Sequence, residues 1–312
     1  MDAMAHPPPF TEPAESRLPE PARTPVGDVP DLPGCDSFPL TERGLETHDE
    51  RIEAWDARTG TAWRVCEVSP WHEQPAQRLA MLAARIASVR GAPIECFGST
   101  SLLRLDTAGR WRQLLQADNV VYLHPGRWSE RGRRVDVDAD PLPDVVLEVD
   151  HTTDVRRWKL GKYQEWEFPE IWVLVPWKKS IRKPGLSIHV RDAGGGYREV
   201  PESAAFPGWT AKEIHRALTE EPLPAAVWRA VERVGRALGA HGGTTPEDDP
   251  LTRSLYVEAV VAALRARDID VPVGAAADGD LLAGRSIHTA MAAATACSDI
   301  ADFRRRIRRA PR

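Results

Sequence analysis

The segment PLPDVVLEVDHTTDVRRWKLGKYQEWEFPEIWVLVP, residues 141–176, restricts the fold more than any other part of the chain. An apolar run at 144–149 predicts a strand, a helical pattern follows at 154–167, and a second apolar run at 171–175 predicts another strand. A strand, a helix and a strand within about 30 residues have the size of a crossover unit. We therefore expect these two strands to run parallel in one sheet.

Helices and strands are also predicted on both sides of this unit. Leu79, Leu82, Ile86 and Val89 recur at helical spacing and predict one amphipathic helix. Short β-branched and aromatic runs predict strands at 94–97, 101–105 and 119–123. A glycine-rich turn within 186–200 predicts a hairpin. Helical patterns resume after residue 210. The fold class expected is α/β of the mixed α+β kind, a mixed central sheet flanked by helices.

The two ends of the chain differ in composition from the middle. Residues 1–45 are dominated by proline and acidic residues, a composition that buries too little apolar surface to fold, so this segment is expected to be disordered. Residues 46–212 carry the strands and helices of the expected central domain. Residues 213–312 are expected to form a helical C-terminal extension that ends in the arginine-rich sequence FRRRIRRAPR.

Charge and hydropathy limit the partners. Lys and Arg total 41 against 46 Asp and Glu, a net charge of −5, so the whole chain has no general attraction for nucleic acid or anionic membranes. The arginine run at the C-terminus is the best local patch, either as a binding surface or as a solvated tail. No apolar run reaches the roughly 18 residues of a membrane span, and the opening residues MDAMAHPPPF lack the basic and apolar regions expected of a secretory signal. We expect a cytoplasmic protein without a membrane partner.

The first predicted strand of the crossover unit carries acidic residues at alternate positions. Asp144, Val146, Glu148 and Asp150 fall on one face, and the three apolar residues between them fall on the other, which is expected to be the buried face. Two residues apart on a strand corresponds to roughly 6.6 Å between Cα atoms. Two carboxylates so placed repel each other, and a divalent cation relieves the repulsion.

Further residues complete a candidate hydrolytic site. Asp118 begins another predicted strand, which a sheet could bring beside Glu148, and the helix after the acidic strand supplies Lys159 and Lys162. Tyr163 lies four residues after Lys159 and so shares its face. Magnesium accepts two carboxylates plus waters and a phosphate oxygen, and a nearby cation stabilises charge in phosphodiester hydrolysis.

These segments resemble a known family. The sequence is similar to the Uma-two family of bacterial restriction endonuclease-like proteins, which belongs to the PD-(D/E)XK nuclease superfamily. The resemblance spans about residues 51–209 and rests on several ordered features, which are SPWHE, QADNVVYL, PDVVLEVDHTTDVRR, Lys159, Tyr163, FPEIWVLVP and FPGW. It implies a restriction-endonuclease-like mixed sheet flanked by helices.

The resemblance also implies roles for particular residues. Asp118 and Glu148 would bind Mg²⁺ or Mn²⁺, and Lys159 would be the catalytic lysine of an endonuclease that hydrolyses DNA. Asp150 stands where the superfamily's lysine would follow Glu148 by two residues, and the family is thought to have moved that lysine to the next helix. Asp144, Asp150, His72 and Tyr163 are expected to support the site. Superfamily members commonly dimerise, so a homodimer is a further expectation.

Each of these residues also has a plainer interpretation. Asp144 follows a proline and could only fix the turn before the strand, and Asp118 could be a solubilising charge on a strand edge. Lys159 would be a surface charge if its helix were rotated by a quarter turn. His72 could be an ordinary histidine at the start of a helix, and Asp150 a helix N-cap.

A rival function follows from the same sequence. A catalytically inactive chain could keep the nuclease fold as a nucleic-acid-binding or interaction module, which Asp150 and the absence of net positive charge favour. Such a module would retard DNA without cutting it. Cleavage by the parent protein that is lost when Glu148 is replaced would distinguish the endonuclease from the inactive module.

Overall fold

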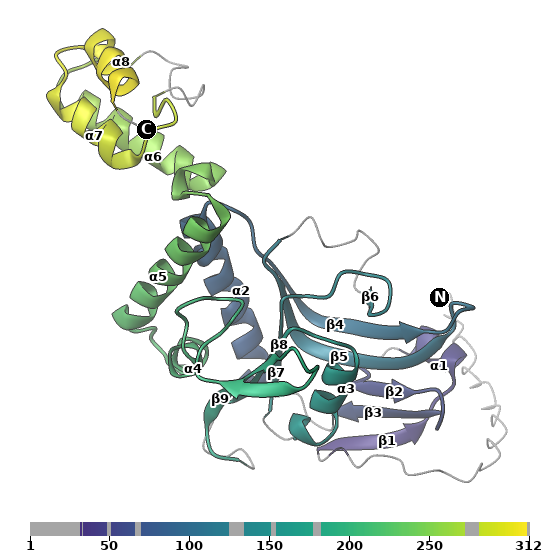
Figure 1. The fold of residues 1–312 in the computed structure, drawn as a ribbon. Helices are drawn as coiled ribbons and strands as arrows, with labels where there is room; N and C mark the ends of the chain where they lie inside the picture. The colour runs from purple at the N-terminus through teal and green to yellow at the C-terminus, as the bar shows by residue number, and fades with distance from the viewer. Residues whose placement is uncertain are drawn as a thin grey trace, which may run out of the picture.

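A mixed β-sheet forms the centre of the molecule (Figure 1). The computed structural model describes residues 32, 34–48, 51–65, 70–124, 134–150, 154–176, 182–271 and 281–310. Within them the sheet has ten strands, eight of which follow the order β1-β3-β2-β5-β7-β8-β9-β10, while β4 pairs with β5 and β6. The strands are β1 Cys35–Pro39, β2 Ala54–Asp56, β3 Thr61–Val65, β4 Glu95–Leu105, β5 Trp111–Tyr122, β6 Arg134–Asp136, β7 Val145–Val149, β8 Glu170–Val175, β9 Gly185–Arg191 and β10 Tyr197–Val200.

The strand pairings confirm the expected mixed sheet. β7 and β8 are parallel neighbours, with Glu148 opposite Val173, as the crossover pattern predicts. β5 runs antiparallel to β7, and β9 and β10 form the predicted antiparallel hairpin. The helical stretch between β7 and β8 consists of a short 3₁₀ turn, η2 (Val155–Arg157), followed by α3 (Lys159–Glu165).

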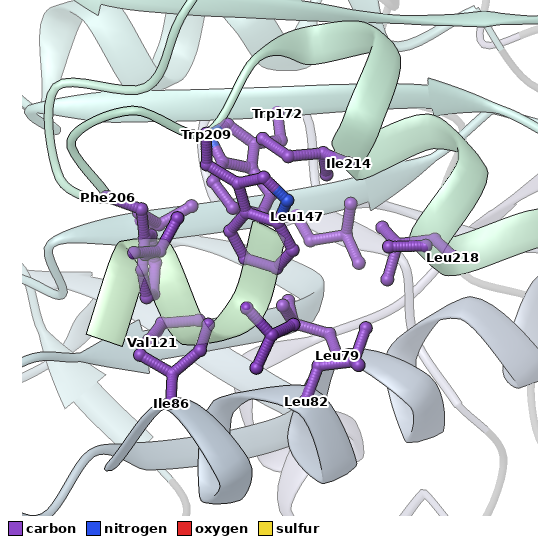
Figure 2. Packing of buried hydrophobic residues seen from close by; sticks show 14 of the residues in the cluster. Leu79, Leu82, Ile86, Val121, Leu147, Trp172, Phe206, Trp209, Ile214 and Leu218 are labelled. Carbon is purple, nitrogen blue, oxygen red and sulfur yellow. The ribbon is translucent and has the colours of Figure 1, made fainter. Parts of the chain in front are cut away.

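Helices cover both faces of the sheet. Three of them, α2 (Pro70–Arg90), α4 (Ala211–Thr219) and α5 (Ala225–Gly242), share one hydrophobic core with β5, β7 and β8. Figure 2 shows Leu79, Leu82 and Ile86 of α2 facing residues of the sheet and of α4. The residues predicted to form the stripe of this helix are all buried. The expected sheet flanked by helices is thus confirmed.

The opposite face of the sheet is also buried, which corrects one expectation. Alternation along β7 is as predicted, since Val145 and Leu147 face the core under α2 while Val146 packs on the side of α3. Every residue of β7 is nevertheless buried, so the acidic face is not presented to solvent. The reason is the parallel pairing with β8, because a crossover helix covers the second face of such strands.

The N-terminal part of the sheet differs from the expected one. The segment expected to be disordered up to residue 45 includes β1 and most of α1 (Glu42–Thr47), because β1 pairs along its whole length with β3. Residues 1–31 of that segment lie outside the described residues. The separate strands expected at 94–97 and 101–105 are one strand, β4, whose pairing with β5 passes through Gly98 and continues at Thr100.

The C-terminal extension divides at a different place from the one expected at residue 212. The helices α4 and α5 belong to the main core, whereas α6 (Pro250–Arg265), α7 (Ile287–Ala296) and α8 (Ile300–Arg309) enclose a hydrophobic core of their own. In Figure 1 this last group projects from the end of α5, away from the sheet. Within the described ranges, none of the helices has the length and apolar character that crossing a bilayer requires.

The contact between α2 and α5 depends on a glycine and yields a prediction. A Cβ atom at Gly235 would lie 2.7 Å from the Cβ of Val89 and 3.0 Å from the carbonyl oxygen of Ile86. Gly235→Ala should therefore push the helices apart and lower the free energy of unfolding by about 1–3 kcal/mol. Gly161→Ala in α3 is the control, since no atom beyond its chain neighbours and its own helix backbone lies within 4 Å of the added Cβ. Urea denaturation should show this control to be neutral or stabilised by up to about 1 kcal/mol, and an equally unaffected Gly235→Ala would contradict the close packing.

Candidate active site

Asp118 lies on β5, next to β7, and is almost completely buried. Its Oδ2 accepts a hydrogen bond of 2.7 Å from the backbone N–H of Val149, so the side chain lies against the end of β7. Its Oδ1 accepts a hydrogen bond of 2.6 Å from Arg51 and lies 3.3 Å from Nε2 of His72, near the start of α2. The predicted site residues Asp118 and His72 are therefore in direct contact.

Glu148 lies on β7 and is only 1% exposed. Its Oε2 accepts a hydrogen bond of 2.8 Å from Nζ of Lys159, and its Oε1 accepts one from the hydroxyl of Tyr163. Lys159 and Tyr163 both come from α3, four residues apart, so the predicted shared face is the face that meets Glu148. The strand and the crossover helix together bring these three residues into one cluster.

The helix α3 is seated firmly on the sheet, which fixes the position of Lys159. The ring of Trp158 packs against Trp63 of β3 with 5.5 Å between centroids, and Tyr163 meets Phe168 edge to face at 5.2 Å. These aromatic residues fill the core on this side of the sheet. Lys159 is the first residue of the helix and is 3% exposed, so its ammonium group is held within the protein interior.

Glu53, which no local sequence pattern marks as a site residue, is part of the same cluster. Its Oε1 accepts a hydrogen bond of 2.5 Å from Nζ of Lys159, whose third acceptor is the backbone carbonyl of Gln116 at 2.7 Å. Glu53 precedes β2, and its backbone bonds to both β3 and β5. The alternating charges of Arg51 and Glu53 before a short apolar run were the available sequence signal for this residue. That signal does not reveal the pairing of β2 with the distant strand β5, which places Glu53 in the cluster.

Burial and charge shift the pKa values within the cluster in opposite directions. Burial raises the pKa of Glu148 to about 7; Lys159 opposes this rise, and the nearby carboxylates of Asp118 and Glu53 add to it. Burial would also raise the pKa of Asp118, but the hydrogen bond and charge of His72 outweigh burial and hold this pKa well below its usual value. Burial tends to lower the pKa of Lys159, yet Glu148 and Glu53 raise it above the usual value, so Lys159 is an ammonium ion at neutral pH.

Two of the expected supporting residues lie elsewhere. Asp144 precedes β7, and its carboxylate accepts a hydrogen bond of 2.8 Å from the backbone N–H of Leu123, so it fixes the entrance to the strand. This contact matches the plainer interpretation of Asp144. Asp150 is fully buried just after β7 and forms an ion pair with Arg182. Glu148 and Asp150 therefore have different cationic partners.

The oxygen atoms of the cluster suit a hard divalent cation. Glu53, Asp118 and Glu148 supply carboxylates, and Oε2 of Glu53 is buried without a hydrogen-bond partner among the described residues. In the part of the chain that the structure describes, no three His, Cys, Asp or Glu side chains are grouped so as to hold one ion. Mg²⁺ commonly needs only one or two carboxylates, because it keeps several waters. Carboxylate oxygens are the donors that Mg²⁺ and Mn²⁺ prefer, and in this structure the oxygens of Asp118 and Glu148 accept hydrogen bonds from the protein itself.

The chain has similarity to known proteins at the level of structure. No protein-family model matches the sequence, and no curated protein matches it. Among solved structures, the chain overlaps a crystal structure described as "a putative nuclease belonging to DUF820 from Anabaena variabilis ATCC 29413", with a TM-score of 0.40 and 10% sequence identity. The overlap covers 58% of this chain and 99% of that chain. The chemistry open to the cluster is therefore argued from the residues of this chain alone.

The ion pair between His72 and Asp118 predicts a dependence of stability on pH. Burial would lower the pKa of His72, but the hydrogen bond and charge of Asp118 raise it from 6.5 to about 9. Protonated His72 therefore contributes stability that is fully present below pH 6.5 and is lost as the pH rises through 9. The contribution has an upper bound of about 3 kcal/mol.

We expect His72→Asn to be less stable than the parent protein at pH 6 and to approach it by pH 9.5. Urea denaturation in EDTA, at several pH values, measures the difference without interference from bound metal. Arg51 and Asp118 remain in the variant, so their ion pair contributes equally to the stability of both proteins. A difference between the two proteins that stays the same across this pH range would contradict the assigned ion pair.

Proposed function

We propose that this chain is a Mg²⁺- or Mn²⁺-dependent endonuclease that hydrolyses phosphodiester bonds of DNA. The observation that supports the proposal most is the convergence of Asp118, Glu148 and Lys159, from three separate segments, on one buried cluster. Buried charges cost free energy, so such a cluster is a candidate for function. The sequence resemblance to the Uma-two family points to the same activity.

Asp118 and Glu148 are the residues that would hold the metal ion, with Glu53 beside them. When bound, Mg²⁺ would supply a water of lowered pKa and would offset negative charge on the phosphate. Arg51 and His72 hold Asp118 ionised, because both are cations in contact with its Oδ1 at neutral pH. The chain thus keeps one carboxylate ionised while the pKa of the other is near 7.

Lys159 acts as a fixed positive charge in this proposal. An ammonium group has three N–H donors, and Glu53, Glu148 and the carbonyl of Gln116 accept all three. Its raised pKa keeps it protonated, so it serves as an electrostatic group and hydrogen-bond donor and not as a general base. A phosphate oxygen that enters the site would take the place of one of these acceptors and receive the charge of Lys159.

Cutting of supercoiled plasmid tests the proposal. Purified protein is expected to nick or linearise the plasmid with Mg²⁺ or Mn²⁺ and to do neither in EDTA. Asp118→Asn should lower the rate on the order of 100-fold or more, because it removes the charge of a proposed metal ligand. The control is Asp138→Asn, which makes the same change of charge at an exposed carboxylate and should leave the rate unchanged. Equal cutting by the Asp118 variant would reject this site.

A catalytically inactive DNA-binding module is the second candidate. Arg51, at 2.6 Å from Oδ1 of Asp118, occupies an oxygen that a metal ion would share, and Asp150 stands in place of the superfamily's lysine. This candidate predicts DNA retardation without cleavage and no rise in melting temperature when Mg²⁺ is added. Metal-dependent cutting by the parent protein that is lost in Asp118→Asn would dispose of it.

A further inference from the structure

The last three helices form a unit with its own hydrophobic core. We call residues 250–271 and 281–310 the α6–α8 unit. Val260 and Leu264 of α6, Ala290 of α7 and Phe303 of α8 are completely buried together. The unit is joined to the rest of the chain through the short 3₁₀ helix Pro246–Asp248, where Glu247 accepts a hydrogen bond from the first backbone N–H of α7. An independent core allows such a unit to serve a separate purpose.

The helix α8 presents an arginine face to solvent. Its inner side is made by Phe303 and Ile307, which are at most 1% exposed and lie one helical turn apart. The five arginines of the helix are all exposed, and they are Arg304, Arg305, Arg306, Arg308 and Arg309. The sequence FRRRIRR is therefore an ordered amphipathic helix and not a frayed tail.

Part of this arginine face is held in place. Arg305 and Arg306 donate hydrogen bonds of 2.7 and 2.8 Å to the two carboxylate oxygens of Asp302, which is buried at the base of the helix. The side chain of Asp299 caps the helix N-terminus through the N–H of Asp302. Ordered guanidinium groups lose less conformational freedom when they bind a ligand than free ones do.

The charge of the unit is opposite to that of the chain as a whole. Its described residues include nine arginines and five aspartates or glutamates, whereas the whole chain has a net charge of −5. A positive surface on an otherwise acidic protein selects an anionic partner locally. Guanidinium groups match phosphate oxygens in geometry, often through two parallel hydrogen bonds.

We propose that the arginine face of α8 binds the phosphate backbone of duplex DNA, as a contact separate from the candidate active site. The choice of DNA as the anion rests on the proposed function. In Figure 1, α8 lies at the end of the molecule away from α3. A second contact on the same substrate raises the local concentration of DNA at the active site without adding any group to the chemistry.

The same face is poorly suited to two other anionic partners. A helix that binds a membrane surface inserts an apolar side into the lipid, but Phe303 and Ile307 are already used in the core of the unit. Single-stranded nucleic acid is commonly held by exposed aromatic rings. Among the described residues of the unit, the Phe, Tyr and Trp side chains are those of Tyr256, which is partly buried, and Phe303, which is buried.

Fluorescence anisotropy with a labelled duplex of mixed sequence, in EDTA to prevent cutting, tests the proposal on the full-length chain. The variant Arg304→Gln/Arg308→Gln/Arg309→Gln leaves the bonds to Asp302 intact. We expect it to bind DNA at least about tenfold more weakly at low salt, because each phosphate contact contributes affinity by releasing counterions from the DNA. The slope of log affinity against log salt should fall by up to about 3.

The control removes three exposed arginines of the main body, Arg198→Gln/Arg229→Gln/Arg236→Gln. It changes the net charge equally and should keep its affinity within about threefold of the parent protein. Replacing the three α8 arginines by lysine should also keep most of the binding, since the charge remains. If the triple glutamine variant melts early, Arg304→Gln alone provides the comparison, with a loss of about two- to threefold expected.

Three results would overturn the proposal. They are equal weakening by the body and α8 variants, no DNA binding by the parent protein, and α8-dependent binding to phosphatidylserine vesicles without binding to DNA. The plasmid assay separates this inference from the proposed function. Loss of plasmid cutting in Asp118→Asn, together with unchanged DNA binding by the α8 variant, would leave the nuclease proposal standing and remove this one. DNA binding that depends on the α8 arginines, in a protein that does not cut plasmid, would support this inference and reject the nuclease proposal.

Discussion

Replacement of Glu148 by glutamine is expected to abolish metal-dependent cutting of plasmid DNA, with a fall on the order of 10³-fold or more. The amide keeps the size of the side chain but removes the negative charge that would hold the metal ion. The fold should survive, because burial, together with Asp118 and Glu53, raises the pKa of Glu148 to about 7 and makes a neutral group tolerable there. We expect the free energy of unfolding to change by about 1 kcal/mol or less.

The matched control for this variant is Glu232→Gln on α5, which changes the net charge equally at a half-exposed position. Its cutting rate should equal that of the parent protein. Rates from plasmid relaxation in Mg²⁺ and Mn²⁺, with melting temperatures of all three proteins, complete the comparison. A Glu148→Gln protein that is folded and still cuts at the parental rate would remove Glu148 from the site.

Replacement of Lys159 by methionine is expected to destabilise the protein by about 3–5 kcal/mol, the cost of removing one partner from a buried ion pair. Lys159 is the shared donor for Glu53 and Glu148, both of them buried. Without it, these carboxylates repel each other and Asp118 in the protein interior, or one of them must take up a proton. Cutting should also be lost, since the fixed charge at the site is gone.

The contrast between two lysines of α3 makes this prediction specific. Lys162 pairs with the half-exposed Glu165 at the surface of the helix, so Lys162→Met should cost less than about 1 kcal/mol. Urea denaturation in EDTA measures both variants. Added Mg²⁺ should stabilise Lys159→Met more than the parent protein, because the cation then offsets the uncompensated carboxylates. Similar losses for the two lysines would show that Lys159 is not an internal ion-pair partner.

The pattern of the sequence predicts the central part of the fold well. The alternation along β7, the helical stripe from Leu79 to Val89 and the glycine turn between β9 and β10 are local features, and each corresponds to an element of the structure. β1, β2 and β3 were not predicted, because their stability comes from pairing with distant strands such as β5. Phe303 and Ile307 carried a helical signal that the arginine run obscured.

The candidate site could be predicted only in part. Asp118, Glu148 and Lys159 were selected from local pattern and from the resemblance, and the structure brings their side chains into one cluster with His72 and Tyr163. Glu53 and Arg51 were missed because their place in the cluster depends on strand pairing across more than 60 residues. Asp144 and Asp150 share the strand's acidic pattern but have structural partners, Leu123 and Arg182.

Direct observation of a bound metal ion tests the central claim most closely, namely that Asp118 and Glu148 together form a metal site beside Lys159. Crystals of the protein soaked in Mn²⁺ can be measured for anomalous scattering, which identifies manganese independently of the protein density. We predict an anomalous peak in contact with the carboxylates of Asp118 and Glu148 that is absent in the Glu148→Gln variant. A map of the parent protein with no peak at these carboxylates, at Mn²⁺ concentrations that support any cutting, would contradict the claim.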